Sequence, residues 1–186
     1  MHKVRKKMNG NQTIYLAGGC FWCTEAFFSK VKGVLEVHSG YAGGFVKNPC
    51  YREVCNGTTG HAECVEVVFD TSIITLEGIL AIFFATHDPT TMNRQGYDVG
   101  TQYRSAIFFT ENGQKEIAES FIRQLEENAV FDSKIVTEIK SLEAFYTAEP
   151  EHHQYYERNS NERYCSIVIS PKLNHLKEQF SSYLIS

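Results

Sequence analysis

The feature that most constrains the fold is a strand–helix–strand pattern that occurs twice along the chain. The first occurrence covers a strand at Thr13–Ala17, a helical pattern that starts at Cys20 and that Gly33 closes, and a strand at Gly33–Tyr41. The second covers a strand at Cys64–Asp70, a helix at Leu76–Thr86 and a strand at Tyr103–Thr110. This order predicts an α+β two-layer sandwich with a ferredoxin-like core and a mixed sheet, although the pattern alone also fits other α/β arrangements.

Further elements and three irregular stretches follow from the same patterns. An amphipathic helix is expected at Asn112–Glu127, a strand at Lys134–Ile139 and a last helix at Pro171–Tyr183. The irregular stretches are residues 42–62, Pro89–Thr101 and Glu149–Asn161, the last of which belongs to an extended irregular C-terminal segment. Long loops in compact domains often carry function, so these stretches are candidates for the functional site.

Length and composition indicate one globular domain. Of the 186 residues, 42% are hydrophobic and 22% are charged, which is typical of a chain with a packed core. We expect a single domain at residues 13–186, preceded by a flexible basic tail at residues 1–12. A formal net charge of −4 gives no reason to expect nucleic acid or a membrane as a partner. Because no apolar run resembles a secretory signal or a membrane span, we expect a cytoplasmic protein, and we expect a monomer.

The cysteines indicate chemistry rather than a disulfide framework. Six are present, at positions 20, 23, 50, 55, 64 and 165. In a cytoplasmic protein such a set points to redox catalysis or metal binding. Zinc is the weaker interpretation, because the second pair, Cys50 and Cys55, has C-x4-C spacing and no nearby His completes a familiar ligand set. We therefore expect no metal.

Cys20 lies where a Gly-Gly turn becomes a helix. The free N–H groups and the dipole of a helix N-terminus stabilise negative charge, so a thiol there is expected to ionise more easily and to react as a thiolate. The alternative is a buried Cys that acts as a small hydrophobic residue. Cys23 completes a C-x-x-C motif, whose two thiols can approach within disulfide range.

Several longer blocks resemble one known family. They are GCFWCTEAFF (from Gly19), GYAGG (Gly40–Gly44), NPCYREVCNGTTGHAE (Asn48–Glu63), HDPT (His87–Thr90), QGYDVGTQYRSAIF (Gln95–Phe108) and HHQYYERN (His152–Asn159). In content and in order they resemble A-type methionine sulfoxide reductases and cover most of residues 13–165. The resemblance implies reduction of the S epimer of methionine sulfoxide, in proteins or as the free amino acid, and it implies no cofactor.

The resemblance also implies roles for individual residues. Cys20 attacks the sulfoxide sulfur, and Glu63 donates the proton that the sulfoxide oxygen needs. A carboxyl group must be neutral to do this, and an apolar wall such as Trp22 raises its pKa by desolvation. Three further residues match positions that hydrogen-bond the oxygen or a water, and these are Tyr51, Tyr103 and Asp98. Phe21 and Trp22 resemble the pocket for the substrate methyl group.

The sulfenic acid left on Cys20 needs a second thiol. By resemblance this thiol is Cys165, carried by a tail that reaches the site, and thioredoxin reduces the resulting disulfide. The chain departs from the family pattern in two ways. No further cysteine follows Cys165, and Cys23 replaces the usual glycine of GCFWG, so Cys23 competes with Cys165 as the resolving thiol.

Two other functions remain open at this stage, a thioredoxin-like dithiol oxidoreductase and a zinc-stabilised binding module. The remaining cysteines are interpreted as structural, and these are Cys50, Cys55 and Cys64. The histidines in the matched blocks are expected to form hydrogen bonds within loops, and these are His61, His87, His152 and His153.

Overall fold

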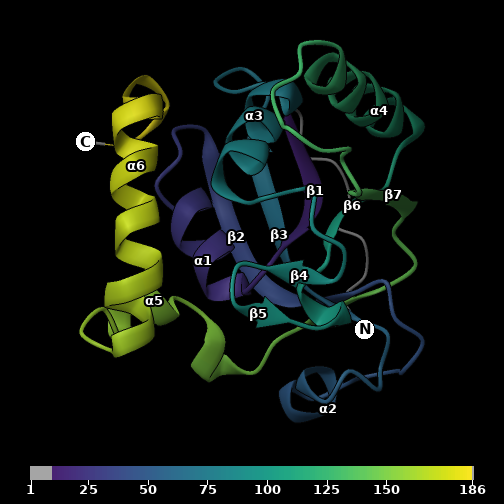
Figure 1. Ribbon diagram of the computed structural model, residues 1–186, viewed down its shortest axis with the longest axis vertical. Coiled ribbons are helices and arrows are strands. Elements are labelled where there is room, and N and C mark those ends of the chain that lie inside the picture. Colours follow the sequence, from purple (N-terminus) through teal and green to yellow (C-terminus); the bar gives the residue numbers. More distant parts are fainter. Residues whose placement is uncertain (1–9, 186) are drawn as a thin grey trace.

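A computed structural model describes residues 10–185 and shows an α+β fold (Figure 1). The strands are β1 (Asn11–Gly18), β2 (Val34–Ala42), β3 (Ala62–Asp70), β4 (Arg94–Gln95), β5 (Asp98–Val99), β6 (Ser105–Phe109), β7 (Glu138–Ser141) and β8 (Phe145–Thr147). The α-helices are α1 (Phe21–Phe28), α2 (Tyr51–Cys55), α3 (Leu76–Thr86), α4 (Asn112–Glu127), α5 (Tyr155–Arg158) and α6 (Ser170–Phe180).

Six strands form one curled, mixed sheet in the order β7-β6-β1-β3-β2-β8. All neighbours in it are antiparallel except β6 and β7, which are parallel. Helix α1 connects β1 to β2, and α3 connects β3 to β6, so both predicted strand–helix–strand patterns are confirmed. The predicted α+β class and mixed sheet are confirmed as well.

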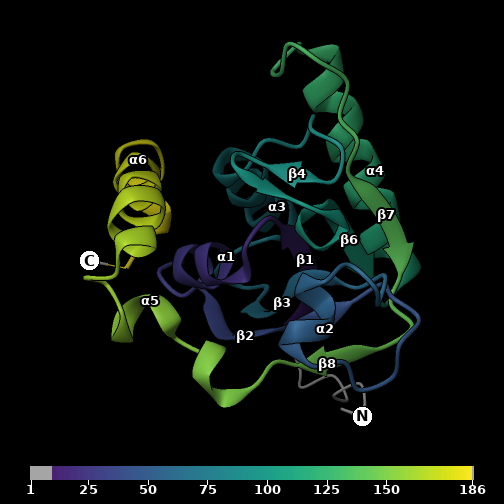
Figure 2. The ribbon, with the colours of Figure 1, turned by 60° about the horizontal axis from the view of Figure 1, so that its bottom comes forward.

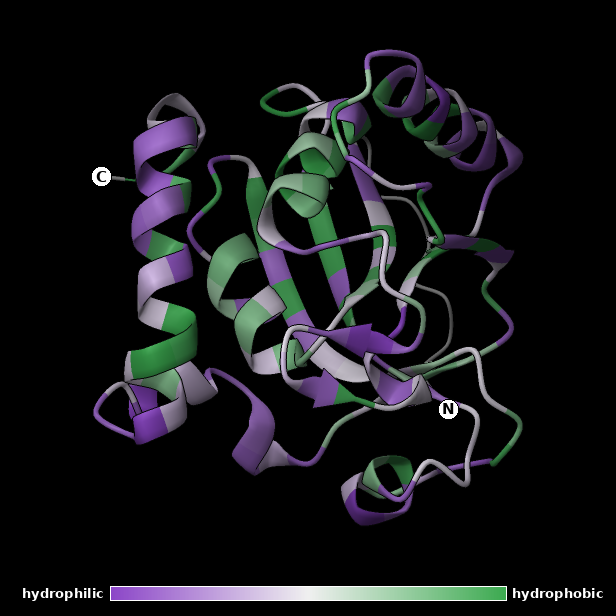
Figure 3. Cartoon of the chain, in the orientation of Figure 1, coloured by the Kyte–Doolittle hydropathy of each residue, from purple (hydrophilic) through white to green (hydrophobic). Residues whose placement is uncertain are grey.

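The core lies between the sheet and the helices α1 and α3, and α6 packs against these two helices. On this face alternate residues of β1 and β3 are fully buried, among them Ile14, Leu16, Val65 and Val67. Figure 3 shows hydrophobic colour over α3 and the central strands, whereas α4 is largely hydrophilic. The opposite face of the sheet holds a smaller apolar cluster, which includes Tyr15 and Phe108. Because both faces of the sheet are covered by apolar clusters, the ends of its strands, where the site lies, are held in place.

The predicted elements agree best where the sequence has a long apolar run, as in α3, or a strong hydrophobic period, as in α4. Helices α3 and α4 have the predicted bounds, whereas α1 ends at Phe28, well before Gly33. Strand β7 starts at Glu138 rather than Lys134. The stretches predicted to be irregular contain α2, β4, β5 and α5, and β8 was not predicted. These elements are short, so neither a helical nor a strand period is visible in the sequence.

The C-terminal segment is more ordered than predicted. A 3₁₀ turn at Pro150–His152 and helix α5 lie in the stretch expected to be irregular. A π-helical segment at Cys165–Ile169 runs directly into α6, so helical structure begins before Pro171. Figures 1 and 2 both show α5 and α6 beside α1 rather than against the sheet.

The predicted N-terminal tail lies mostly outside the described residues. Its last two residues, Asn11 and Gln12, form the start of β1, so the strand begins two residues earlier than predicted. Within residues 10–185, no helix has the length and apolar character needed to cross a membrane.

Candidate active site

The turn between β1 and α1 places Cys20 at the start of the helix. Gly19 has a φ of +93°, and a Cβ atom there would lie 2.7 Å from Cγ of Gln95, so this position requires glycine. Cys20 is the N-cap residue of α1 and is 9% exposed. Its carbonyl oxygen accepts the N–H of Cys23 at 3.1 Å, which begins the helix. The predicted placement of Cys20 is therefore confirmed.

Glu63, on β3, is the acidic group beside Cys20. Its side chain is 1% exposed, and Oε2 accepts the N–H of Phe21 at 2.9 Å. This bond satisfies one of the free N–H groups at the N-terminus of α1. The other oxygen, Oε1, has no hydrogen-bond partner within the described part of the chain. Burial raises the pKa of Glu63 to about 8, so the carboxyl group carries a proton at neutral pH.

The Cys20 and Cys23 thiols contact each other through a hydrogen bond. Burial raises the pKa of Cys20 well above its ordinary value, and the neighbouring Cys23 and Glu63 add to the effect. The expectation that Cys20 ionises easily is therefore wrong for the resting protein, because loss of hydration outweighs the helix dipole. The hydrogen bond with Cys20 lowers the pKa of Cys23 instead.

An aromatic wall stands beside these thiols. The Trp22 ring stacks on Tyr155 with centroids 3.7 Å apart, and its Nε1–H donates to Nδ1 of His152 at 3.2 Å. Burial lowers the pKa of His152, which keeps the imidazole neutral and able to accept. Phe21 stacks on Tyr51 at 6.1 Å, and Tyr51 lies 4.2 Å from the His152 ring. The predicted pocket residues Phe21 and Trp22 therefore belong to a larger cluster.

Tyr51 is held in this cluster by Glu149. The backbone N–H of Tyr51, the first residue of α2, donates to Oε1 of Glu149 at 2.7 Å. The Tyr41 hydroxyl donates to the other oxygen of the same carboxylate, also at 2.7 Å. One carboxylate thus ties α2, β2 and the C-terminal segment together. Burial raises the pKa of the Tyr51 hydroxyl, so it remains a hydrogen-bond donor at neutral pH.

Tyr103 and Asp98 approach the site from the stretch around β5. Tyr103 lies in the 3₁₀ turn Thr101–Tyr103, just before β6. Burial raises the pKa of its hydroxyl, and the charges of Glu63, Cys55 and Cys20 add to the effect. Asp98 accepts the Tyr164 hydroxyl at 2.9 Å, so in the resting protein it is tied to the C-terminal segment.

Cys165 is buried rather than on an exposed, irregular tail. It starts the π-helical segment, is 0% exposed and packs in the same core cluster as Cys20 and Cys23. Burial raises the pKa of its thiol, and the charge of Cys23 contributes. The hydroxyl of the preceding residue, Tyr164, lies 3.8 Å from Sγ of Cys23. Cys23 is therefore the thiol that faces both Cys20 and the segment of Cys165.

The other cysteines and the histidines occupy varied positions. Cys50 is exposed, Cys55 is partly buried beside Tyr51, and Cys64 is buried in the sheet. All four histidines of the matched blocks are hydrogen-bonded, but the prediction of bonds within loops is confirmed only for His61 and His153. It is wrong for His87, which bonds Phe83 on α3 and Ser105 on β6, and for His152, which accepts the N–H of Trp22 on α1. Across residues 10–185, no group of three or more His, Cys, Asp or Glu side chains is arranged to hold a metal ion.

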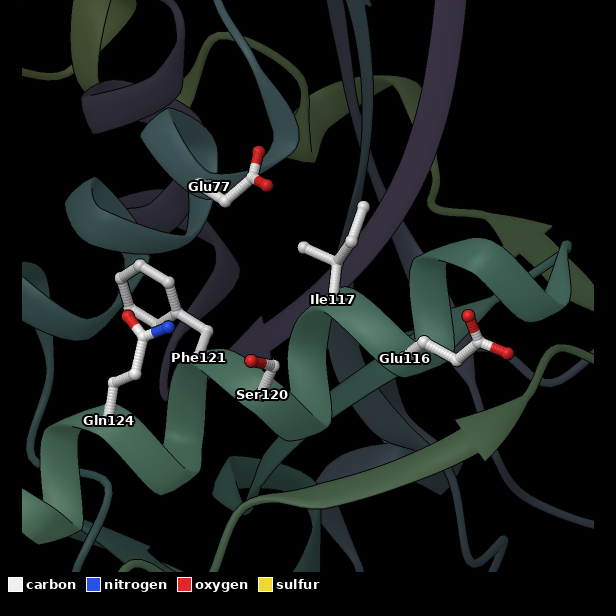
Figure 4. A pocket seen from close by; sticks show the side chains of 6 residues that line it. All are labelled: Glu77, Glu116, Ile117, Ser120, Phe121 and Gln124. Atoms are coloured by element: carbon white, nitrogen blue, oxygen red, sulfur yellow. The ribbon is translucent and has the colours of Figure 1, made fainter.

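Sequence reasoning missed Tyr155, Tyr164, Glu149 and the ring contacts of His152. The aromatic and acidic composition of this stretch was the available signal, but no periodicity predicted which side chains face α1. A separate hollow of about 240 Å³ lies between α3 and α4 and contains none of the predicted site residues (Figure 4). Its lining consists of Glu77, Glu116, Ile117, Ser120, Phe121 and Gln124.

Comparisons with known proteins agree with this site. The family model described as "Peptide methionine sulfoxide reductase" matches residues 12–184. The peptide methionine sulfoxide reductase MsrA of Saccharolobus solfataricus is 53% identical over 165 residues, which cover 89% of this chain and 92% of the relative. The enzyme of the same name from Trichodesmium erythraeum is 55% identical over 168 residues, covering 90% and 95%.

Solved structures give the same result. Mxr1 of Saccharomyces cerevisiae in its reduced form superposes with a TM-score of 0.79 at 34% identity, covering 87% of this chain and 92% of that one. Mxr1 in complex with Trx2 gives a TM-score of 0.56 at 27% identity, covering 82% and 91%.

A buried thiol at a helix N-cap, beside a protonated carboxyl group and an aromatic wall, is the arrangement of a cysteine-dependent oxidoreductase. The chain belongs to the peptide methionine sulfoxide reductase family, and within it to the A type, the peptide-methionine (S)-S-oxide reductases. This membership decides against the thioredoxin-like oxidoreductase and the zinc-stabilised module.

Proposed function

We propose that Cys20 attacks the sulfur of methionine S-sulfoxide and that Glu63 supplies the proton that the oxygen needs. The observation that carries this proposal is the buried Glu63 carboxyl group. It is bound through Oε2 to the first N–H of α1, has Oε1 unpartnered among the described residues, and is protonated at neutral pH. A neutral carboxyl group next to a nucleophile is the arrangement that general acid catalysis requires.

The atoms of this step balance without a cofactor. A bond forms between Sγ of Cys20 and the sulfoxide sulfur while Glu63 protonates the oxygen. This S–S bond and the S–O bond of the methionine sulfur then break as the hydroxyl group passes to Sγ, which leaves a sulfenic acid on Cys20. The methionine sulfur is reduced to a thioether, and the cysteine sulfur is oxidised. The net reaction moves the Cys20 thiol proton to the oxygen, with Glu63 as the carrier. The raised pKa of Cys20 means that the thiol keeps this proton until a substrate arrives.

The pocket around these groups supports a selection between the two sulfoxide epimers. Phe21 and Trp22 offer an apolar surface for the substrate methyl group. The Tyr51 and Tyr103 hydroxyls are donors for the sulfoxide oxygen, since burial keeps both protonated. Asp98 is proposed to join them through a water after it leaves Tyr164. Such a pocket fixes the methyl group and the oxygen at once, and so accepts one epimer.

Two thiols compete to resolve the sulfenic acid. The sequence-based preference for Cys165 stays a prediction. Because its thiol is 0% exposed within a helical segment, this residue must move to reach Cys20. Cys23 needs less motion, since its thiol is already hydrogen-bonded to Cys20. In either case the resolving thiolate displaces water and leaves a disulfide, which thioredoxin reduces by thiol exchange. The complex of the similar protein Mxr1 with Trx2 supports this reductant.

The wider setting follows from the same membership. We propose a cytoplasmic monomer that repairs oxidised proteins and also reduces free methionine sulfoxide. We also propose that the four central strands form a ferredoxin-like core. The antiparallel order β6-β1-β3-β2, with α1 and α3 as the two crossovers, supports this description.

Thioredoxin-coupled turnover on the separate sulfoxide epimers tests the function. The S epimer is expected to be reduced, the R epimer is expected to be inert, and Cys20→Ser is expected to be inactive on both. Cys50→Ser is the matched control, since Cys50 is exposed and outside the proposed machinery. Equal rates on both epimers, or turnover by Cys20→Ser, would overturn the proposal.

A further inference from the structure

The proposed reaction uses one buried carboxyl group, that of Glu63. A second buried carboxyl group lies on the active-site helix itself. Glu25, on α1, is 4% exposed. Burial raises its pKa to about 7. It lies three residues after Trp22, so both side chains project from the same side of the helix. Its contacts are with the C-terminal segment and with β2, not with the thiols.

The contacts of Glu25 concentrate on one turn of the C-terminal segment. Oε2 accepts the backbone N–H of Gln154 at 2.7 Å, and the N–H of Tyr155 also interacts with the carboxyl group. Oε1 lies 3.8 Å from Nδ1 of His153. The buried Ser39 hydroxyl, on β2, and the imidazole of His38 also interact with the carboxyl group.

This turn has a backbone conformation that needs support. Gln154 has a φ of +53°, in the left-handed region that side chains other than glycine rarely adopt. Such residues persist only where the surroundings hold them. The hydrogen bond from Gln154 to Glu25 is a short contact at that residue. Glu25 is therefore placed to hold the turn.

The residues on both sides of this turn are the ring partners of Trp22. His152 accepts the indole N–H, and Tyr155 stacks on the indole face. If the turn shifts, both contacts are lost together. We propose that Glu25 is a positioning residue, whose carboxyl group fixes the turn at Gln154 so that His152 and Tyr155 hold the Trp22 ring for the substrate methyl group. This inference rests on the proposed role of Trp22.

Two substitutions separate the reach of the side chain from its charge. Glu25→Gln keeps the length and an acceptor oxygen for the Gln154 N–H, and it is expected to keep the wild-type KM. Glu25→Asp keeps the charge but is one methylene shorter. It is expected to raise KM for methionine S-sulfoxide about tenfold, the cost of leaving one buried N–H without its acceptor, with a much smaller change in kcat. A structural role alone would lower the folded fraction and kcat without this change in KM.

The fluorescence of the protein gives a readout that needs no turnover. The chain has a single Trp, so all indole emission comes from Trp22. Glu25→Asp is expected to change the emission intensity and wavelength, because the ring loses Tyr155, while Glu25→Gln keeps the wild-type spectrum. Glu66→Gln is the control, since Glu66 is also a buried carboxyl group and accepts the Tyr15 hydroxyl.

The outcomes are distinct. Unchanged KM and emission in Glu25→Asp would overturn the inference, and so would a tenfold rise in KM in Glu25→Gln. If Glu25→Asp does not fold, a tenfold rise in KM in Glu25→Gln would still overturn the inference. If the wild-type protein is inactive on both epimers, the proposed function is refuted. The emission spectra would still test whether Glu25 holds the turn at Gln154.

Discussion

The active-site helix α1 contacts two regions of different construction. On one side, the turn after β1 carries Cys20 and strand β3 carries Glu63. These two residues lie far apart in the sequence, and the hydrogen bond from the Phe21 N–H to Glu63 joins the start of α1 to β3. On the other side, the segment from Glu149 to Ile169 contributes side chains from short helical turns and no strand of the sheet. The reacting groups thus lie on the region with the most interstrand hydrogen bonds. His152 and Tyr155, which contact Trp22, and the distant thiol of Cys165 lie on the other region.

This difference predicts that the two regions affect different kinetic constants. Substitutions on the sheet side are expected to affect kcat, whereas those on the C-terminal side are expected to affect KM and resolution. Segments with few interstrand hydrogen bonds open more easily than sheets. Under the proposed mechanism Cys165 leaves its buried position to react and Tyr164 releases Asp98, and both Cys165 and Tyr164 lie in the region that can move.

The largest effect is expected at Glu63. Glu63→Gln removes the donated proton and is expected to lower kcat/KM by about 10³-fold, within the range for loss of general acid catalysis. Because the pKa of Glu63 is raised to about 8, the active protonated form dominates below that pH and is lost above it. The wild-type rate should therefore fall above pH 8, and the variant should lack this step. If the rate of Glu63→Gln fell above pH 8 as the wild-type rate does, the assignment of Glu63 as the acid would be contradicted.

The next effect concerns the resolving thiols. Cys23→Ser and Cys165→Ser are each expected to yield one equivalent of methionine, because Cys20 reacts before either thiol is needed. With thioredoxin present, the variant that lacks the resolving thiol should stop after this first turnover, and the other variant should continue to turn over. Peptide mass spectrometry of wild-type protein after one turnover identifies the bond. A dominant Cys20–Cys23 disulfide would contradict the prediction that Cys165 is the resolving thiol.

Tyr155→Ala tests the wall. It removes the ring stacked on Trp22 and is expected to raise KM about fivefold, the worth of one aromatic pair. The value of kcat should change little, since Cys20 and Glu63 are held by the sheet. Steady-state kinetics on free methionine S-sulfoxide measures both values. A loss confined to kcat would show that this region does more than bind.

The smallest effect is expected from Tyr164→Phe. This substitution removes the bond to Asp98 and the contact with Cys23 but keeps the ring. Asp98 becomes free to face the substrate, so KM is expected to stay the same or fall slightly. Tyr156→Phe is the control, because that hydroxyl contacts Ser170, away from Cys20. A large rise in KM in Tyr164→Phe alone would mean that Tyr164 itself binds the substrate.

The same contrast explains what the sequence predicted. Helix α3 is a nearly continuous apolar run that ends before Asp88-Pro89, and α4 has a strong hydrophobic period, so the bounds of both were predicted correctly. The placement of Cys20 followed from the Gly-Gly turn. The wall residue Tyr155 lies in a helix of four residues, too short for any period. The direction of the Cys20 pKa was wrong because helix position is visible in a sequence, whereas burial by β3 and the C-terminal segment is not.

The most direct test of the central claim is to trap the oxidised sulfur. In a Cys23→Ser/Cys165→Ser variant, one equivalent of methionine S-sulfoxide is added and a sulfenic-acid reagent such as dimedone is supplied. The expected result is one methionine released per chain and one adduct, located on Cys20 by peptide mass spectrometry. Methionine released with Cys20 unmodified, or an adduct on another cysteine, would contradict the claim.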